Sequence, residues 1–67
     1  MALTWQTARS GDRLDAFDAE TGELRAYVWR LTDERWLAIR LGVVGDRPLG
    51  QGHTAEAARA LVEERIG

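Results

Sequence analysis

The stretch RWLAIRL, residues 35 to 41, decides the fold, because its side chains alternate in the way that a β-strand requires. The two sides of this strand are Leu37, Ile39 and Leu41 on one, and Trp36, Ala38 and Arg40 on the other. A strand with one buried and one solvated side has no need of a tryptophan on the solvated side. The stretch therefore raises the question of what covers Trp36.

Further strand patterns lie on both sides of this stretch. The segments expected to form strands are 2–9, 13–19, 24–31 and 35–43, with a short edge segment near Pro48–Gly50. Turn residues separate them at 10–12, 20–23 and 32–34. Within the second turn, Gly22 can adopt the positive φ angle that a short hairpin connection demands. The order of these segments predicts an antiparallel meander.

The carboxyl-terminal stretch TAEAARALVEERI, residues 54–66, predicts a helix that begins after the capping residue Thr54. An apolar stripe at helical spacing consists of Ala55, Ala58, Leu61, Val62 and Ile66. The expected fold is therefore of the α+β class. It is a single small domain, 1–67, in which a three- to four-stranded antiparallel meander is followed by one helix packed on one face.

The helix offers mostly small side chains, so we expect it to sit on the aliphatic side of the sheet. The residues expected beneath it are Ala26, Val28, Leu37, Ile39 and Leu41. The opposite face would then carry Arg25, Tyr27, Trp29, Trp36 and Arg40. Large aromatic side chains interleaved with arginine are typical of protein interfaces.

Three hypotheses account for such a face. Trp5, Trp29 and Trp36 could fill a second small core beneath the amino-terminal segment. The face could instead mediate self-association, or it could bind a nucleic acid or another protein.

Composition narrows the functional classes. The 67 residues contain no cysteine and a single histidine, His53, so we expect no metal, no cofactor and no catalytic group set, and hence no enzyme. No apolar run of about 20 residues and no secretion signal is visible, so we expect no membrane association and a cytoplasmic location. All nine basic residues are arginine, which suggests a GC-rich genome, with a phage origin as one hypothesis.

Two resemblances fall in the carboxyl-terminal half. The residues WLAIR, 36–40, and LGQGHTAEAARAL, 49–61, resemble DNA-binding domains of the ethylene-response-factor type and of integrase arms. That resemblance implies a three-stranded sheet that enters the major groove. The groove-facing positions it implies are Trp29, Arg30, Trp36 and Arg40.

The second resemblance is to HicB-type antitoxins. It rests on GHTAEAA, residues 52–58, with Gly52, Thr54, Glu56 and the pair Ala57–Ala58 at the matching positions. It implies a small strand–strand–strand–helix regulatory domain.

We expect a small non-enzymatic binding or regulatory module that acts through this sheet face. A protein partner or a homodimer is favoured over nucleic acid because the net charge is −2 and few arginines can share the face. The alternative is a DNA-binding domain of the integrase-arm or transcription-factor type. The predicted binding residues are Arg25, Tyr27, Trp29, Arg30, Trp36 and Arg40.

Overall fold

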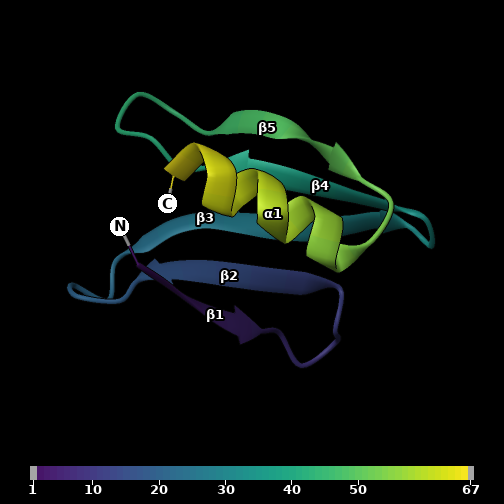
Figure 1. Cartoon of the computed structure of the whole chain (residues 1–67), viewed down its shortest axis with the longest axis horizontal. Helices are drawn as coiled ribbons and strands as arrows, with labels where there is room; N and C mark the ends of the chain where they lie inside the picture. The colour runs from purple at the N-terminus through teal and green to yellow at the C-terminus, as the bar shows by residue number, and fades with distance from the viewer. Residues whose placement is uncertain (1, 67) are drawn as a thin grey trace.

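The computed structural model describes residues 2–66, which form a five-stranded antiparallel sheet and one helix (Figure 1). The elements are β1 (Leu3–Thr7), β2 (Arg13–Asp18), β3 (Leu24–Thr32), β4 (Arg35–Arg40), β5 (Arg47–Gly52) and α1 (Ala55–Ile66). The spatial order of the strands equals their order in the chain. The predicted α+β meander with a carboxyl-terminal helix is confirmed, with five strands where three or four were expected.

The β2–β3 turn owes its shape to Gly22 and Asp18. Gly22 has a φ angle of 76°, a conformation that costs glycine little, and its N–H donates to the carbonyl oxygen of Asp18 over 2.8 Å. The side-chain oxygen Oδ1 of Asp18 accepts from the backbone N–H of Glu20 at 2.8 Å and of Thr21 at 3.3 Å. The tight turn predicted at 20–23 is therefore present.

Helix α1 lies across one face of the sheet, which we call the helix face. Its first turn is capped as predicted, because the Thr54 hydroxyl accepts the N–H of Ala57 over 3.1 Å. Gly52 of β5 lies beneath this turn, and a Cβ atom at that position would come within 2.8 Å of the Ala57 Cβ and the Ala58 nitrogen. The glycine thus allows the helix to approach the edge of the sheet closely.

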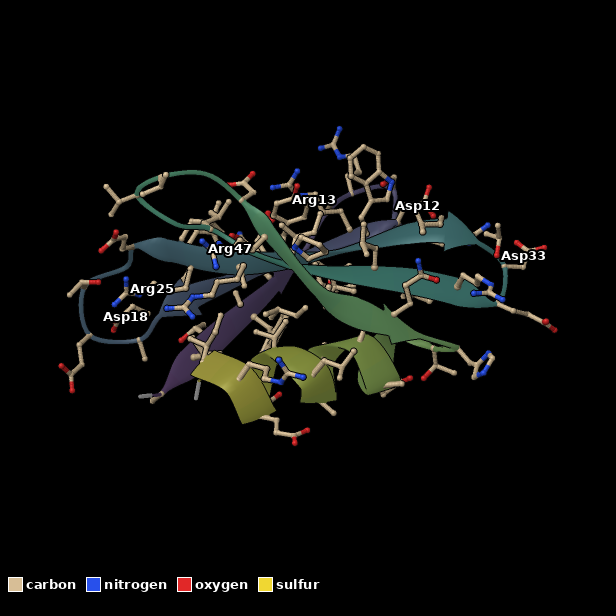
Figure 2. All side chains as sticks on the ribbon, turned by 90° about the horizontal axis from the view of Figure 1, so that it is seen from above. Asp12, Arg13, Asp18, Arg25, Asp33 and Arg47 are labelled. Carbon is tan, nitrogen blue, oxygen red and sulfur yellow. The ribbon has the colours of Figure 1, made fainter. Side chains whose placement is uncertain are left out.

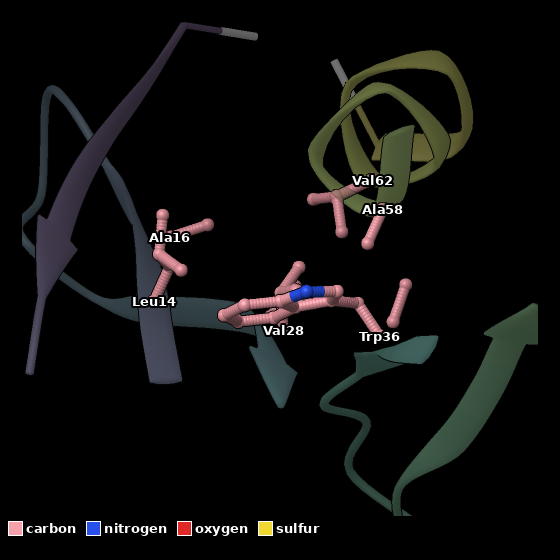
Figure 3. Close-up of a cluster of buried hydrophobic side chains, with 8 residues drawn as sticks. Leu14, Ala16, Val28, Trp36, Ala58 and Val62 are labelled. Carbon is pink, nitrogen blue, oxygen red and sulfur yellow. The ribbon is translucent and has the colours of Figure 1, made fainter. Parts of the chain in front are cut away.

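Small side chains form most of the closed core between the sheet and the helix (Figure 3). Its buried apolar members are Leu14, Ala16, Ala26, Val28, Trp36, Ala38, Ala58 and Val62. Only Val28 and Val62 are large side chains that are fully buried. The indole of Trp36 lies over Val28 and beneath α1 (Figure 3). With 9% of its surface exposed, Trp36 is covered by the chain's own helix.

The prediction that Trp36 lies opposite the helix is therefore wrong, as is the prediction that Leu37 and Ile39 lie beneath it. A β-bulge between Arg30 and Thr32 is the cause. A regular hairpin with a two-residue turn at 33–34 would pair Val28 with Ile39, whereas the observed register pairs Val28 with Ala38. Because side chains alternate with a period of two, this single extra residue, Leu31, exchanges the two faces of β4.

No helix among residues 2–66 has the length and apolar character that crossing a membrane would require.

Candidate functional site

The side of the sheet away from α1 carries a continuous apolar surface, which we call the open face. Its central residues are Phe17, Tyr27, Trp29, Leu37 and Ile39, from the three middle strands. The register places Trp29 beside Leu37 and Tyr27 beside Ile39. Among the described residues no helix or loop covers this surface, and the edge-on view shows α1 on the other side only (Figure 2).

Exposure differs along the open face. Trp29 is 50% exposed and Leu31, beyond it on the same strand, is 49% exposed. The neighbouring central residues are half-buried, because their side chains shield one another. Trp29 also borders a shallow hollow of about 340 Å³, which is lined by Ala8, Ser10, Asp12, Arg13 and Trp29. Tryptophan is among the residue types that most often dominate the binding energy of protein interfaces.

One pair of opposite charges interrupts the apolar surface. The Nε atom of Arg13 lies 2.8 Å from Oδ1 of Asp15, and the Arg13 guanidinium stacks over the Tyr27 ring at 4.2 Å from its centroid. Arg13 points away from the helix (Figure 2). The pair places almost no net charge at the centre of the face.

The two outer strands give the open face a polar border. Across the sheet, Thr4 is paired with Phe17, Gln6 with Asp15, and Gln51 with Leu37. Near this border the Arg35 guanidinium donates to the Gln51 side-chain oxygen over 3.1 Å. An apolar centre with a polar rim is the general anatomy of a protein interface.

The six predicted binding residues do not form one surface. Tyr27 and Trp29 lie on the open face as predicted, whereas Trp36 is in the closed core. Arg30 forms ion pairs with Asp12 at 3.5 Å and with Asp33 at 2.9 Å.

The arginines Arg25 and Arg40 were predicted beside the aromatic rings, and this placement is wrong. Both line a cavity with Arg65 and Ile66 of α1, so they lie at the carboxyl-terminal end of the helix. Arg25 is the extra residue of a second bulge, since Ala16 pairs with Ala26 but Phe17 pairs with Leu24. The bulge breaks the alternation that would have placed Arg25 on the same side as Tyr27. Leu41, expected beneath the helix, lies beyond β4 and lines the same cavity.

The hypothesis of a second small core containing three tryptophans is also wrong. Trp5 packs against the closed core on the helix face, where the Arg59 guanidinium stacks at 4.9 Å from its ring. Trp36 belongs to the same core, and Trp29 alone lies on the open face.

Sequence reasoning missed Arg13, Asp15, Phe17, Leu37 and Ile39 as members of the open face. A signal for them was present in the small residues. Ala16 pairs with Ala26, and Ala38 pairs with Val28, two residues further along β3 on the same face, so the three alanines form the surface on which the helix rests. Aligning these alanines would have placed Leu37 and Ile39 on the other side.

Asp18 is the one buried charged residue among residues 2–66. The backbone N–H of Glu20 lowers the pKa of this carboxyl group, and burial opposes that effect. The N–H of Thr21 and the Arg25 guanidinium, 3.8 Å from Oδ2, lower the pKa further. Asp18 therefore stabilises the β2–β3 turn in its ionised, carboxylate form.

Within residues 2–66, no three histidine, cysteine, aspartate or glutamate side chains gather as a metal site would need. No family model, curated protein or solved structure matches this chain.

Proposed function

We propose that this protein is a small non-enzymatic binding module that associates with a second copy of itself through the open face. The observation that carries the proposal is the half-exposed Trp29 within an apolar surface that α1, the one helix among residues 2–66, does not cover. Contiguous apolar surface that a chain leaves uncovered marks sites of association.

The size of the face supports a second copy as the occupant. Five strands about 4.8 Å apart and about six residues long span roughly 24 by 20 Å. Two such faces in contact would bury on the order of 1,000 Å², which is the lower limit for a specific interface. The chain exposes 4630 Å², about a tenth more than the roughly 4,250 Å² expected for a compact monomer of its length.

The charge distribution also supports a second copy. The Arg13–Asp15 ion pair leaves the centre of the face nearly neutral, so two copies would not repel each other. The polar edge strands would form the rim. Packing two sheets face to face at about 10 Å separation is a common way to bury such a surface.

The test measures mass by sedimentation velocity from about 1 μM to about 500 μM, a range that spans weak to moderate dimers. We expect a dimer for the native sequence and a folded monomer for Trp29→Glu. Ala60→Glu is the matched control, because Ala60 is exposed on the outer side of α1, opposite the open face, and this variant should stay dimeric. Circular dichroism verifies that each variant folds.

Two outcomes would overturn the proposal. A native protein that stays monomeric throughout the range excludes self-association, and a folded Trp29→Glu variant that stays dimeric excludes the open face. A shift of duplex DNA at low salt that disappears when Arg25, Arg30 and Arg40 all become alanine would favour the DNA-binding alternative instead.

A further inference from the structure

A second cluster lies on the helix side, at the end of the molecule where α1 stops. Arg25 of β3, Arg40 of β4, Arg47 of β5 and Arg65 of α1 come together there. Arg40 lies between Ala26 on one neighbouring strand and Arg47 on the other. Figure 2 shows Arg25 and Arg47 at the same end of the sheet as Asp18. We call these four residues the arginine end.

The arginines of this cluster are weakly engaged by the protein's own acids. Arg40, Arg47 and Arg65 form no ion pair with any acidic residue among residues 2–66. Arg25 makes only loose pairs, at 3.8 Å with Asp18 and 4.0 Å with Glu23. Elsewhere, Arg13 and Arg30 each pair with an aspartate at 2.9 Å or less. The cluster therefore keeps charge and hydrogen-bond donors available for a ligand.

Arg25 adds a second observation. Its Nε atom is buried and has no hydrogen-bond acceptor among the described residues. This burial fixes the stem of the side chain, which is 36% exposed overall, so the terminal guanidinium nitrogens are the donors that a ligand in the cavity can reach. An oxyanion is the acceptor that a guanidinium binds most strongly.

Three adjoining cavities meet at Arg40. The first, about 140 Å³, is lined by Arg25, Arg40, Leu41, Arg65 and Ile66. The second, about 260 Å³, is lined by Arg40, Gly42, Val43, Val44, Gly45 and Arg47. The third, about 310 Å³, also contains Arg25 and Arg40. A ligand could thus place an anionic group in the first cavity and a larger body in the second.

We propose that the arginine end binds a small phosphate monoester. Arg25, Arg40 and Arg65 would hold the phosphate, because three guanidinium groups match a dianion with three terminal oxygens better than a singly charged carboxylate. The organic part would lie over the β4–β5 loop, whose Val43 and Val44 side chains are 106% and 97% exposed. Such a ligand would cover these two valines.

The neighbouring acids restrict the ligand to a small molecule. Asp18, Glu23 and Asp46 lie in or next to the segments that form the arginine end, and the whole chain has a net charge of −2. A long polyanion would meet these carboxylates, whereas a single phosphate contacts the arginines alone. None of the five central residues of the open face lines these cavities, so the phosphate site does not rest on the proposed self-association.

The test is an NMR titration at constant ionic strength that follows the arginine Nε–Hε and backbone amide signals, with phenyl phosphate, inorganic phosphate and acetate as probes. We expect phenyl phosphate to bind more tightly than inorganic phosphate, and acetate to bind weakest. Arg40→Gln should weaken phenyl phosphate binding about tenfold or more, the effect of losing one charged, paired contact. Arg9→Gln is the matched control, because Arg9 is an exposed turn residue outside all these cavities.

Equal weakening by Arg40→Gln and Arg9→Gln would show nonspecific attraction and overturn the site. Acetate binding as tight as phosphate would overturn the assignment of a phosphate group. Inorganic phosphate binding as tight as phenyl phosphate would overturn the role of the Val43–Val44 loop. The amide spectrum of Arg40→Gln reports directly whether that variant is folded.

Discussion

The two faces of this sheet differ in the size of the side chains they carry. The helix face is closed and consists largely of alanine, with Ala16, Ala26 and Ala38 fully buried. The open face carries bulky side chains that the chain itself leaves uncovered. Small side chains let the helix approach the helix face closely. The large apolar side chains lie on the open face, where no other part of the described chain covers them. The helix face therefore stabilises the monomer, and the open face is the one through which we propose association.

The largest expected effect comes from replacing the buried Trp36 with alanine, compared with the same replacement of the half-exposed Trp29. Trp36→Ala removes the largest side chain of the closed core and should cost about 3–5 kcal/mol. A domain of this length has a free energy of unfolding of roughly 3–10 kcal/mol, so this variant should be largely unfolded or close to it. Urea denaturation followed by circular dichroism measures the loss.

Trp29→Ala is the matched control for this prediction. Its ring is half exposed, so in the monomer it should cost only about 1 kcal/mol, measured at a protein concentration too low for association. Equal losses from both substitutions would contradict the division into a stabilising and an associating face.

Enlarging an alanine of the helix face should have the next largest effect. Ala26 is fully buried between Ala16 and Arg40 of its neighbouring strands. Ala26→Leu therefore forces α1 away from the sheet and should cost about 1–3 kcal/mol. Ala60→Leu, on the exposed side of the helix, should change the urea midpoint little. If Ala26→Leu left the urea midpoint unchanged, α1 would not be held at a fixed distance from the sheet.

Most of the secondary structure could be predicted from the sequence, because it depends on local signals. Gly22 marks a hairpin turn, Thr54 marks the start of the helix, and the apolar stripe of the helix is the one that packs. These features involve residues close together in the chain, where residue type and spacing decide the backbone conformation.

The faces of the strands could not be predicted in the same way. Both sides of residues 35–41 are apolar, so alternation alone does not say which side is buried. The answer depends on the bulges at Arg25 and Leu31, each of which shifts the register by one residue. Bulges arise from the pairing of whole strands, and no glycine or other turn residue at Arg25 or Leu31 indicates them in the sequence. This is why Trp36, Arg25 and Arg40 were placed on the wrong side, whereas Tyr27 and Trp29 were placed correctly.

Removing the helix cap should lower the free energy of unfolding by less than the substitutions above, and it should leave association unchanged. Thr54→Ala leaves the N–H of Ala57 without its acceptor and should lower the free energy of unfolding by about 1 kcal/mol. Thr54→Ser keeps a hydroxyl and should restore most of that loss in thermal denaturation. Neither substitution should change the mass measured by sedimentation, since the cap lies on the side opposite the open face. A change in mass would show that the two faces are coupled.

The smallest effect concerns how stability depends on pH. Because the pKa of Asp18 is lower in the folded state than its ordinary value of about 3.9, the unfolded chain takes up this proton first as the pH falls. The stabilising contribution is therefore complete above about pH 4 and disappears as the pH falls through the lower, folded-state pKa. Urea midpoints between pH 7 and pH 2.5 measure it.

Asp18→Asn should reduce the acid sensitivity of the fold, so its stability and that of the native sequence should begin to converge below about pH 4 and converge fully only below the folded-state pKa of Asp18. Asp15→Asn removes a carboxylate from the open face instead and serves as the matched comparison. If Asp15→Asn reduced the acid sensitivity as much as Asp18→Asn, the turn at Asp18 would not be the origin of the effect. The acid dependence of the monomer would then belong to the open face as well, and the separation of roles between the two faces would fail at this point.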